Sequence, residues 1–215
     1  MTKIKICCIA DAGEAQMAIN AGADAVGLVG PMPSGPGIIS LDTAKDITSS
    51  LPQHIWSFLL TSQIEARAIA DEVLAIGTNT VQIVSHVDPT ESEKLKCLLP
   101  DVRCVQVLHV EDESSIALVD DYAPFVDMFL LDSGRPSAVI PELGGTGRTH
   151  DWSLSRKIVE RSPVPVFLAG GLTPDNIGEA IKAVRPYGVD ICSGVRTNGR
   201  LDAEKLERFV VAVKA

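Results

Sequence analysis

The sequence predicts a single-domain (β/α)₈ barrel, and three observations lead to that prediction. Short apolar runs alternate with amphipathic stretches about eight times, which is typical of parallel βαβ units. The chain has 215 residues, which fits a compact barrel with short connections, since the fold usually takes about 250 residues. No Pro/Ser-rich linker divides the sequence. A doubly wound open sheet is the alternative, although about five or six strands are usual for that fold.

The individual elements follow from periodicity and capping signals. The predicted strands are the apolar runs at residues 3–8, 25–29, 55–60, 80–84, 103–108, 126–131, 164–169 and 189–192. The predicted helices have apolar side chains at helical spacing and lie near residues 12–21, 41–50, 63–75, 90–99, 112–120, 152–161, 174–184 and 202–213. Ser40 is an expected N-cap, and Thr173 is an expected cap with Pro174 at the first helical position. Residues 132–149 lack a periodic element, and a long loop after the sixth strand predicts a functional segment at the C-terminal face of a barrel.

Composition excludes several classes of function. The chain carries 19 basic and 28 acidic side chains, for a net charge of −9, which argues against a nucleic-acid or anionic-membrane surface. No apolar stretch approaches the roughly 18 residues of a membrane-spanning helix, and the N-terminus lacks the apolar segment of a signal peptide. A cytoplasmic location is therefore expected, with neither nucleic acid nor a membrane as partner.

The cysteines do not form a recognisable framework. Five of them are scattered along the chain without a C-x-x-C pair, which fits neither a set of disulfides nor a structural zinc site. His86 and His109 follow the fourth and fifth strands and could form a metal site with Cys7 and Cys192, but their spacing is not diagnostic. No metal is expected.

Two side chains at strand ends are candidates for acid–base chemistry. Cys7 ends the first strand, where it could act as a base or nucleophile, although a free cysteine in an apolar strand is more often a core residue. Asp132 ends the sixth strand, where it could transfer protons or simply cap a loop. Strand alternation places Lys5 on the same face as Cys7, and Asp190 on the last strand is its candidate partner, a structural interpretation.

Glycines after the last two strands indicate a phosphate site. Gly170 and Gly171 follow the seventh strand, and Ser193 and Gly194 follow the eighth. Barrels often bind phosphate at these two strand ends, where glycine lets backbone N–H groups approach an anion. Glycines in left-handed turns are the structural alternative.

The motifs together resemble phosphoribosylanthranilate isomerases over nearly the whole chain. The opening KICCIADAGEAQMAINAGADAVGLV is similar to the family's first strand, which typically reads K-I-C-G-I-T. The match continues in order with FLLD at 129–132, GGTGRTHDW at 144–152, VPVFLAGGLTPDNIGEAI at 164–181 and VDICSGV at 189–195.

The resemblance implies a barrel of tryptophan biosynthesis that performs an Amadori rearrangement of N-(5-phosphoribosyl)anthranilate without cofactor or metal. It implies that Cys7 is the general base and Asp132 the general acid. It further implies a phosphate cradle at Gly170, Gly171, Ser193 and Gly194, a substrate loop with Gly144, Gly145, Thr146 and Gly147, and a substrate contact at Gln82. The small-molecule partner would be a phosphosugar, and the family includes monomers and homodimers.

Several positions depart from the family pattern. Gly37 stands where the family usually has a substrate-binding Arg, and Val84 stands where it usually has His. Cys8 replaces a Gly and Arg196 replaces a Glu. Two other functions therefore remain open at this point: a related isomerase that acts on a different phosphosugar, and a non-catalytic paralogue that binds one. Arg135, Arg148 and Arg196 in rim loops are candidates to compensate for the missing Arg.

Overall fold

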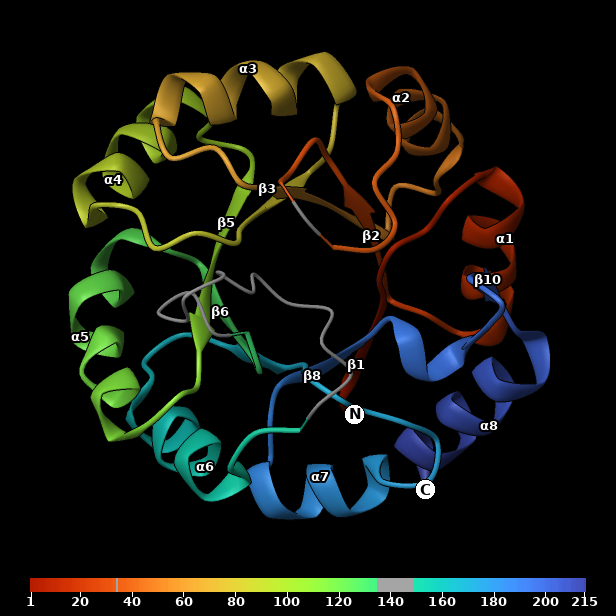
Figure 1. Ribbon diagram of the computed structural model, residues 1–215. Coiled ribbons are helices and arrows are strands. Elements are labelled where there is room, and N and C mark those ends of the chain that lie inside the picture. The colour runs from red at the N-terminus through yellow and green to blue at the C-terminus, as the bar shows by residue number, and fades with distance from the viewer. Residues whose placement is uncertain (34, 135–148) are drawn as a thin grey trace.

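The computed structural model describes residues 1–33, 35–134 and 149–215. Eight parallel strands follow one another in sequence order around a closed barrel, and the helices surround it (Figure 1). Strand β1 pairs with both β2 and β8, and this closes the ring. The (β/α)₈ prediction is therefore confirmed. A doubly wound open sheet is excluded, because in an open sheet the first and last strands of the ring, here β1 and β8, would not pair with each other.

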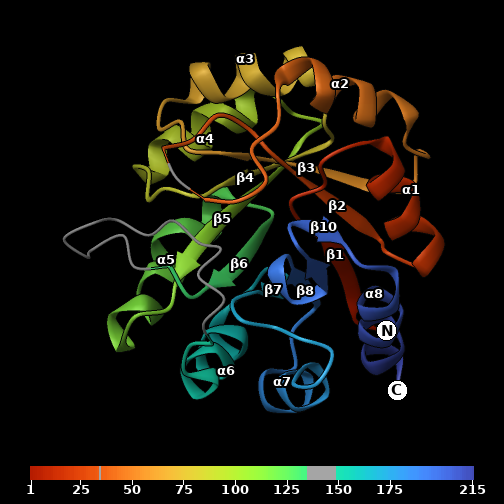
Figure 2. The same cartoon turned by 45° about the vertical axis from the view of Figure 1, so that its right-hand side comes forward.

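The elements have the following bounds. The barrel strands are β1 (Lys3–Ile6), β2 (Ala25–Val29), β3 (Trp56–Thr61), β4 (Thr80–Ile83), β5 (Arg103–His109), β6 (Met128–Asp132), β7 (Val166–Leu168) and β8 (Gly188–Ile191). The α-helices are α1 (Ala12–Ala21), α2 (Leu41–Ser50), α3 (Ala66–Ile76), α4 (Pro89–Leu98), α5 (Leu118–Tyr122), α6 (Trp152–Arg161), α7 (Ile177–Val184) and α8 (Ala203–Lys214). A short ribbon of β9 (Arg196–Thr197) and β10 (Arg200–Leu201) connects the end of β8 to α8. Figure 2 shows the same ring of helices from a second side.

Strand alternation divides the apolar side chains into two layers. One layer packs between the strands and the helices, and the other fills the barrel interior. In the interior, Phe58 and Phe167 meet edge to face with ring centroids 6.0 Å apart. Gly188 makes room for this contact, because a Cβ there would lie 2.4 Å from a ring carbon of Phe167. The barrel interior around these rings is thus a packed core, as in other barrels of this kind.

Most helix predictions hold, and Ser40 is the N-cap of α2, where its side chain accepts from the Thr43 N–H. The prediction for α7 is wrong at its start. The helix begins at Ile177, with Asn176 as N-cap, instead of directly after Thr173. Thr173 and Asn176 hold a separate turn, in which the Asn176 Oδ1 accepts from the Thr173 N–H at 2.8 Å. Because of this turn, α7 begins about one helical turn later in the sequence than predicted.

The predicted helix at 112–120 is also wrong in form. The structure has a 3₁₀ turn over Glu113–Ile116, then the short α5, then a second 3₁₀ turn over Ala123–Phe125. The Ser115 hydroxyl donates to the His109 carbonyl at 3.0 Å, so the first turn is tied back to β5. Pro124 lacks an N–H group, so it cannot extend a regular helix at the other end.

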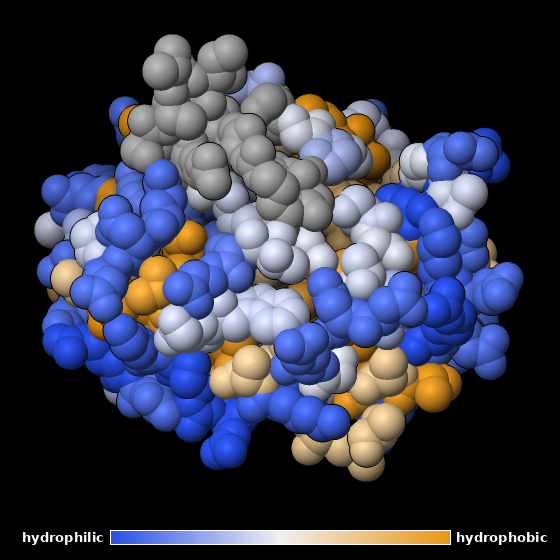
Figure 3. Space-filling view, turned by 60° about the horizontal axis from the view of Figure 1, so that its bottom comes forward, coloured by the Kyte–Doolittle hydropathy of each residue, from blue (hydrophilic) through white to orange (hydrophobic). Residues whose placement is uncertain are grey.

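The surface seen in Figure 3 is mostly hydrophilic, with apolar residues scattered over it. Among the described residues, no helix has the length and apolar character that crossing a bilayer would require.

Candidate active site

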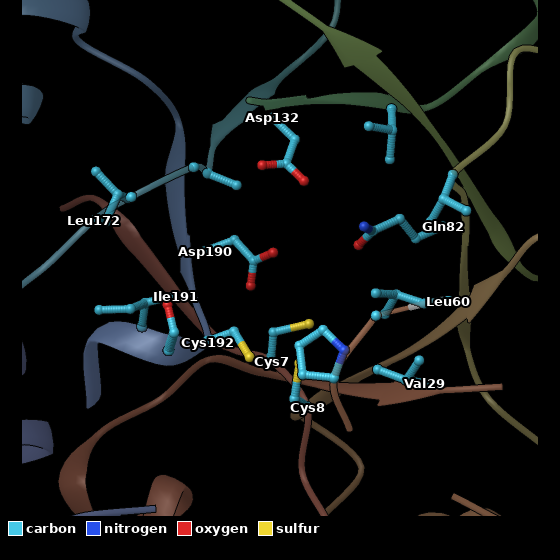
Figure 4. A pocket seen from close by; sticks show the side chains of 18 of the residues that line it. Cys7, Cys8, Val29, Leu60, Gln82, Asp132, Leu172, Asp190, Ile191 and Cys192 are labelled. Carbon is cyan, nitrogen blue, oxygen red and sulfur yellow. The ribbon is translucent and has the colours of Figure 1, made fainter. Parts of the chain in front are cut away.

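One cavity lies where the barrel strands end. Its walls include residues at or just after the C-terminal ends of the strands (Figure 4). The lining residues are Cys7, Cys8, Val29, Met32, Gly35, Pro36, Leu60, Gln82, Val84, Val107, Asp132, Ala169, Gly170, Gly171, Leu172, Asp190, Ile191, Cys192 and Ser193. Residues from opposite sides of the ring therefore share one space, at the face where barrel enzymes place their chemistry.

Cys7 and Asp132 both line this cavity, from β1 and β6 respectively. Cys7 is only 5% exposed, and its N–H donates to the Ile191 carbonyl at 2.8 Å, which joins the end of β1 to β8. A Cβ at Gly27 would lie 2.8 Å from the Cys7 Sγ, so the absence of a side chain on β2 makes room for the sulfur. The residue after it, Cys8, has φ +61°, and this left-handed turn leads the chain away from the strand.

Asp132 is a partly buried carboxyl whose surroundings favour its protonated form. Burial, together with the nearby carboxylate of Asp190, raises its pKa to about 6, although a backbone hydrogen bond opposes the shift. That hydrogen bond is donated by the Ser133 N–H to Oδ1 at 2.7 Å. A carboxyl with this pKa can hold and release a proton near neutral pH.

Lys5 and Asp190 form an ion pair inside the barrel. The Lys5 Nζ lies 2.8 Å from the Asp190 Oδ2, and the two residues are neighbours in the register of β1 and β8. The predicted pairing is therefore correct. Asp190 also lines the cavity, a role that the sequence analysis did not assign to it. Its position on the same face of β8 as Cys192 is the signal that could have shown this.

The predicted phosphate residues lie in two neighbouring loops, with different relations to the cavity. Gly170, Gly171 and Ser193 line it, and the two glycines have φ of +82° and +62°. Gly194 does not line it. A Cβ at Gly194 would lie 2.1 Å from the Leu172 carbonyl oxygen, so this glycine lets the loop after β8 pack against the loop after β7.

Gln82 extends from β4 into the cavity wall (Figure 4). Its Oε1 is buried and accepts no hydrogen bond from the described residues. An unpartnered buried amide oxygen is costly in a folded protein, and a ligand group that donates to it would remove that cost. Gly144, Gly145, Thr146 and Gly147, along with Arg135 and Arg148, lie outside the described residues.

The cavity wall on the side of β2, β3 and β4 is apolar. Val29, Met32, Leu60 and Val84 line this side, and Val107 on β5 continues it. Sequence reasoning singled out Val84 but missed the other four, because each looks like an ordinary core residue. Only their place at the strand ends distinguishes them.

Arg196 is already bound to groups of the protein. Its guanidinium contacts both carboxylate oxygens of Glu14, at 3.0 and 2.9 Å, and also donates to the carbonyl oxygens of Cys8 and Gly199. These bonds hold the loop after β1 against the loop after β8. The idea that Arg196 replaces the missing anion-binding Arg therefore has no support in its contacts.

His86 and His109 lie close together and outside the cavity that Cys7 and Cys192 line. The rings of His86 and His109 have centroids 5.5 Å apart, and the His109 Nε2 lies 2.9 Å from the Val84 carbonyl oxygen. Neither lines the cavity with Cys7 and Cys192. Among the described residues, no group of three or more His, Cys, Asp or Glu side chains could hold a metal ion.

Comparison with known proteins agrees with this geometry. A family model for N-(5′-phosphoribosyl)anthranilate (PRA) isomerase matches residues 4–212. An N-(5′-phosphoribosyl)anthranilate isomerase of Methanocella arvoryzae is 35% identical over 100% of this chain and 99% of its own. The crystal structure of phosphoribosyl anthranilate isomerase from Thermotoga maritima has a TM-score of 0.85 and 30% identity, and the match covers 100% of this chain and 99% of that one.

A further crystal structure shows a phosphoribosyl anthranilate isomerase in complex with reduced 1-(o-carboxyphenylamino)-1-deoxyribulose 5-phosphate. It has a TM-score of 0.83 and 28% identity, and the match covers 100% of this chain and 99% of that one. Because both the family model and the relatives span almost the whole barrel, this chain belongs to the N-(5′-phosphoribosyl)anthranilate isomerase family.

Proposed function

We propose that this protein catalyses the Amadori rearrangement of N-(5-phosphoribosyl)anthranilate to 1-(2-carboxyphenylamino)-1-deoxyribulose 5-phosphate, a step of tryptophan biosynthesis. The observation that carries the proposal is the meeting of Cys7 and Asp132 in one cavity. One is a thiol at the end of β1, and the other is a carboxyl with a pKa raised to about 6. An aldose–ketose rearrangement needs such a base and such an acid on one substrate.

Asp132 acts first, as the acid. It gives its proton to the ring oxygen of the ribofuranose while the bond between C1 and that oxygen breaks, and the nitrogen lone pair forms a Schiff base with C1. Burial suits the carboxyl to this role, because it keeps a proton on the group that an exposed aspartate would have lost.

Cys7 then acts as the base. Its thiolate removes the proton from C2, and the electrons of that C–H bond form the C1=C2 bond of an enolamine. Return of a proton to C1 and loss of the proton on the C2 hydroxyl give the ketone. Atoms and electrons balance within the substrate, since C1 is reduced as C2 is oxidised.

The loops after β7 and β8 are the proposed phosphate cradle. Gly170, Gly171 and Ser193 line the cavity there, and Gly194 allows the two loops to approach. Backbone N–H groups can approach an anion closely where glycines carry no side chain. The apolar wall of Val29, Leu60 and Val84 would face the aromatic ring, and Gln82 would accept from a polar hydrogen of the substrate.

The proposal extends to the setting of the reaction. The ligand is a small phosphosugar, and the protein acts as a monomer or homodimer, which sedimentation velocity would decide. A cytoplasmic location suits its five free cysteines, because reducing compartments keep thiols in that form.

The test is turnover of freshly made N-(5-phosphoribosyl)anthranilate, followed by the loss of its fluorescence. Cys7→Ala and Asp132→Asn should each lower kcat by about 10²- to 10⁴-fold, as loss of a general acid or base does. Cys97→Ala is the matched control, because Cys97 is an exposed thiol on α4. Turnover that survives both site substitutions would overturn the proposal.

A further inference from the structure

The ion pair of Lys5 and Asp190 needs an explanation beyond stability. The Lys5 side chain is 0% exposed and Asp190 is 7% exposed. Removing two charges from water often costs as much as their attraction returns, so a buried pair is a weak source of stability. The contact is also imperfect, because the Asp190 Oδ1 has no hydrogen-bond partner among the described residues.

The pair lies next to both proposed reacting groups. Lys5 precedes Cys7 by two residues on the same face of β1. The point that a Cβ on Gly27 would occupy lies 2.8 Å from the Cys7 Sγ and 3.2 Å from the Lys5 Nζ, so the sulfur and the ammonium border one small space. The Asp190 carboxylate points into the cavity that Asp132 also enters (Figure 4).

We propose that Lys5 and Asp190 are positioning residues that divide charge between the acid and the base. The Lys5 ammonium stabilises Cys7 as a thiolate, and the Asp190 carboxylate keeps Asp132 protonated. This inference rests on the proposed function, because it presupposes opposite proton states for Cys7 and Asp132.

The charges around the two groups agree with this division. Burial opposes the charge on Lys5, but the charges of Asp190 and Cys7 outweigh it and raise the Lys5 pKa, so the ammonium persists over the working pH range. At Asp132, burial and then the charge of Asp190 raise the pKa, and the opposing effect of Lys5 is smaller than that of Asp190. The Lys5 end of the pair thus favours the thiolate form of Cys7, and the Asp190 end favours the protonated form of Asp132.

Other charged and titratable groups near Cys7 could also affect its ionisation. Cys8 follows it in the loop after β1, and Cys192 and Asp190 line the cavity from the end of β8. Arg196 approaches only the Cys7 backbone, where its Nη2 lies 3.4 Å from the carbonyl oxygen, and Glu14 offsets its charge. Lys5 is therefore the cation that a variant can remove without disturbing the loops that Arg196 holds.

The experiment measures the ionisation of Cys7 without using turnover. Wild-type protein, Lys5→Met and the double variant Lys5→Met/Asp190→Asn are treated with iodoacetamide across a pH series, and alkylation of Cys7 is followed by peptide mass spectrometry. Only a thiolate reacts rapidly. Cys97 in the same sample is the internal control, because it is an exposed thiol on α4.

On this proposal, alkylation of Cys7 at pH 7 falls at least tenfold in Lys5→Met, its profile moves to higher pH, and Cys97 is unchanged. The double variant removes the unpaired carboxylate and guards against a failure to fold. The lower alkylation of Cys7 should persist in the double variant. If the pair were only structural, two neutral side chains would replace it and alkylation would return to the wild-type level. Equal alkylation of Cys7 in all three proteins, or recovery in the double variant, would overturn the proposal.

A failure of this inference can be distinguished from a failure of the proposed function. A wild-type protein that does not turn over N-(5-phosphoribosyl)anthranilate, yet shows a Lys5-dependent thiolate, would contradict the substrate and leave the charge division intact. Robust turnover with no effect of Lys5→Met on alkylation of Cys7 would support the proposed function and contradict the charge division.

Discussion

Gly37 lies directly against Cys8, and a side chain could not be added at Gly37 without strain. A Cβ at Gly37 would lie 2.5 Å from the Cys8 Cβ and 3.0 Å from its Cα. Gly37 has φ +80° and Cys8 has φ +61°, so both are in the left-handed region that favours glycine. The two departures from the family pattern, a Gly for an Arg and a Cys for a Gly, therefore meet at one contact.

The first prediction concerns this contact. Gly37→Arg should lower the free energy of unfolding by about 2–3 kcal/mol, because it combines overpacking with an unfavourable φ. In a Cys8→Gly background the loss should shrink by at least about 1 kcal/mol, as expected for residues in direct contact. Urea denaturation of the four proteins of the cycle measures the coupling. Equal losses in both backgrounds would show that the Cys8 side chain is not the obstacle.

A second prediction concerns the room that Gly27 leaves for the proposed base. Gly27→Ala would place a methyl group 2.8 Å from the Cys7 Sγ and should force the sulfur aside. Displacement of a reacting group by about 1 Å can cost about 10²-fold in rate, so kcat should fall by that order. Gly178→Ala is the control, because nothing lies within 4 Å of a Cβ there and the residue is inside α7. Unchanged turnover in Gly27→Ala would mean that Cys7 does not depend on this space.

A third prediction follows from the Asp132 pKa of about 6. Asp132 must be protonated to act as the acid, so the fraction of the protein with a competent acid should decline by about tenfold per pH unit above that value. The decline appears in kcat/KM wherever Cys7 is already ionised. Asp190→Asn removes a charge that raises this pKa, so the decline should then begin at lower pH. Activity measured in buffers of constant ionic strength checks both statements. A pH profile of Asp190→Asn identical to that of the wild type would contradict the role of Asp132.

A fourth prediction concerns the stability cost of the same carboxyl. Its pKa rises from 3.8 in the unfolded chain to about 6 in the folded protein, so the folded state binds the proton more tightly. The stability that this group contributes is present below about pH 4 and is lost as the pH rises through about 6.

The neutral variant Asp132→Asn should therefore be more stable than the wild type at pH 7.5, by up to about 3 kcal/mol, and show little difference near pH 4. Urea denaturation at the two pH values tests this. An Asn variant less stable at pH 7.5 would show that the charged carboxylate is well accommodated.

A fifth prediction concerns Arg196, which stands where the family usually has Glu. Burial raises the Glu14 pKa, but hydrogen bonds from Arg196 and from the backbone more than offset this and lower it overall. Arg196→Glu would set two carboxylates together where a mostly buried ion pair stood, and should lower the free energy of unfolding by about 3–5 kcal/mol. Arg196→Lys keeps the positive charge without the bidentate geometry, so the free energy of unfolding should fall by less. A Glu variant as stable as the Lys variant would contradict this account.

The sequence by itself determined the architecture of the protein. Alternating apolar runs and amphipathic stretches are set by local periodicity, so the barrel could be predicted, along with most helix positions. It also placed Cys7, Asp132, Gly170, Gly171 and Ser193 at strand ends, and in a closed barrel strand ends meet at one face. The pairing of Lys5 with Asp190 followed in the same way from strand alternation.

Only the tertiary structure decided relations between side chains from different strands. Sequence periodicity does not say that Gly37 touches Cys8, that Gly194 is a packing residue, or that Arg196 is bound to Glu14. The starts and forms of α5 and α7 also depended on contacts such as that between Ser115 and the His109 carbonyl. The partial burial that raises the pKa of Asp132 is likewise a property of the closed barrel, because side chains from several strands line the cavity around the carboxyl.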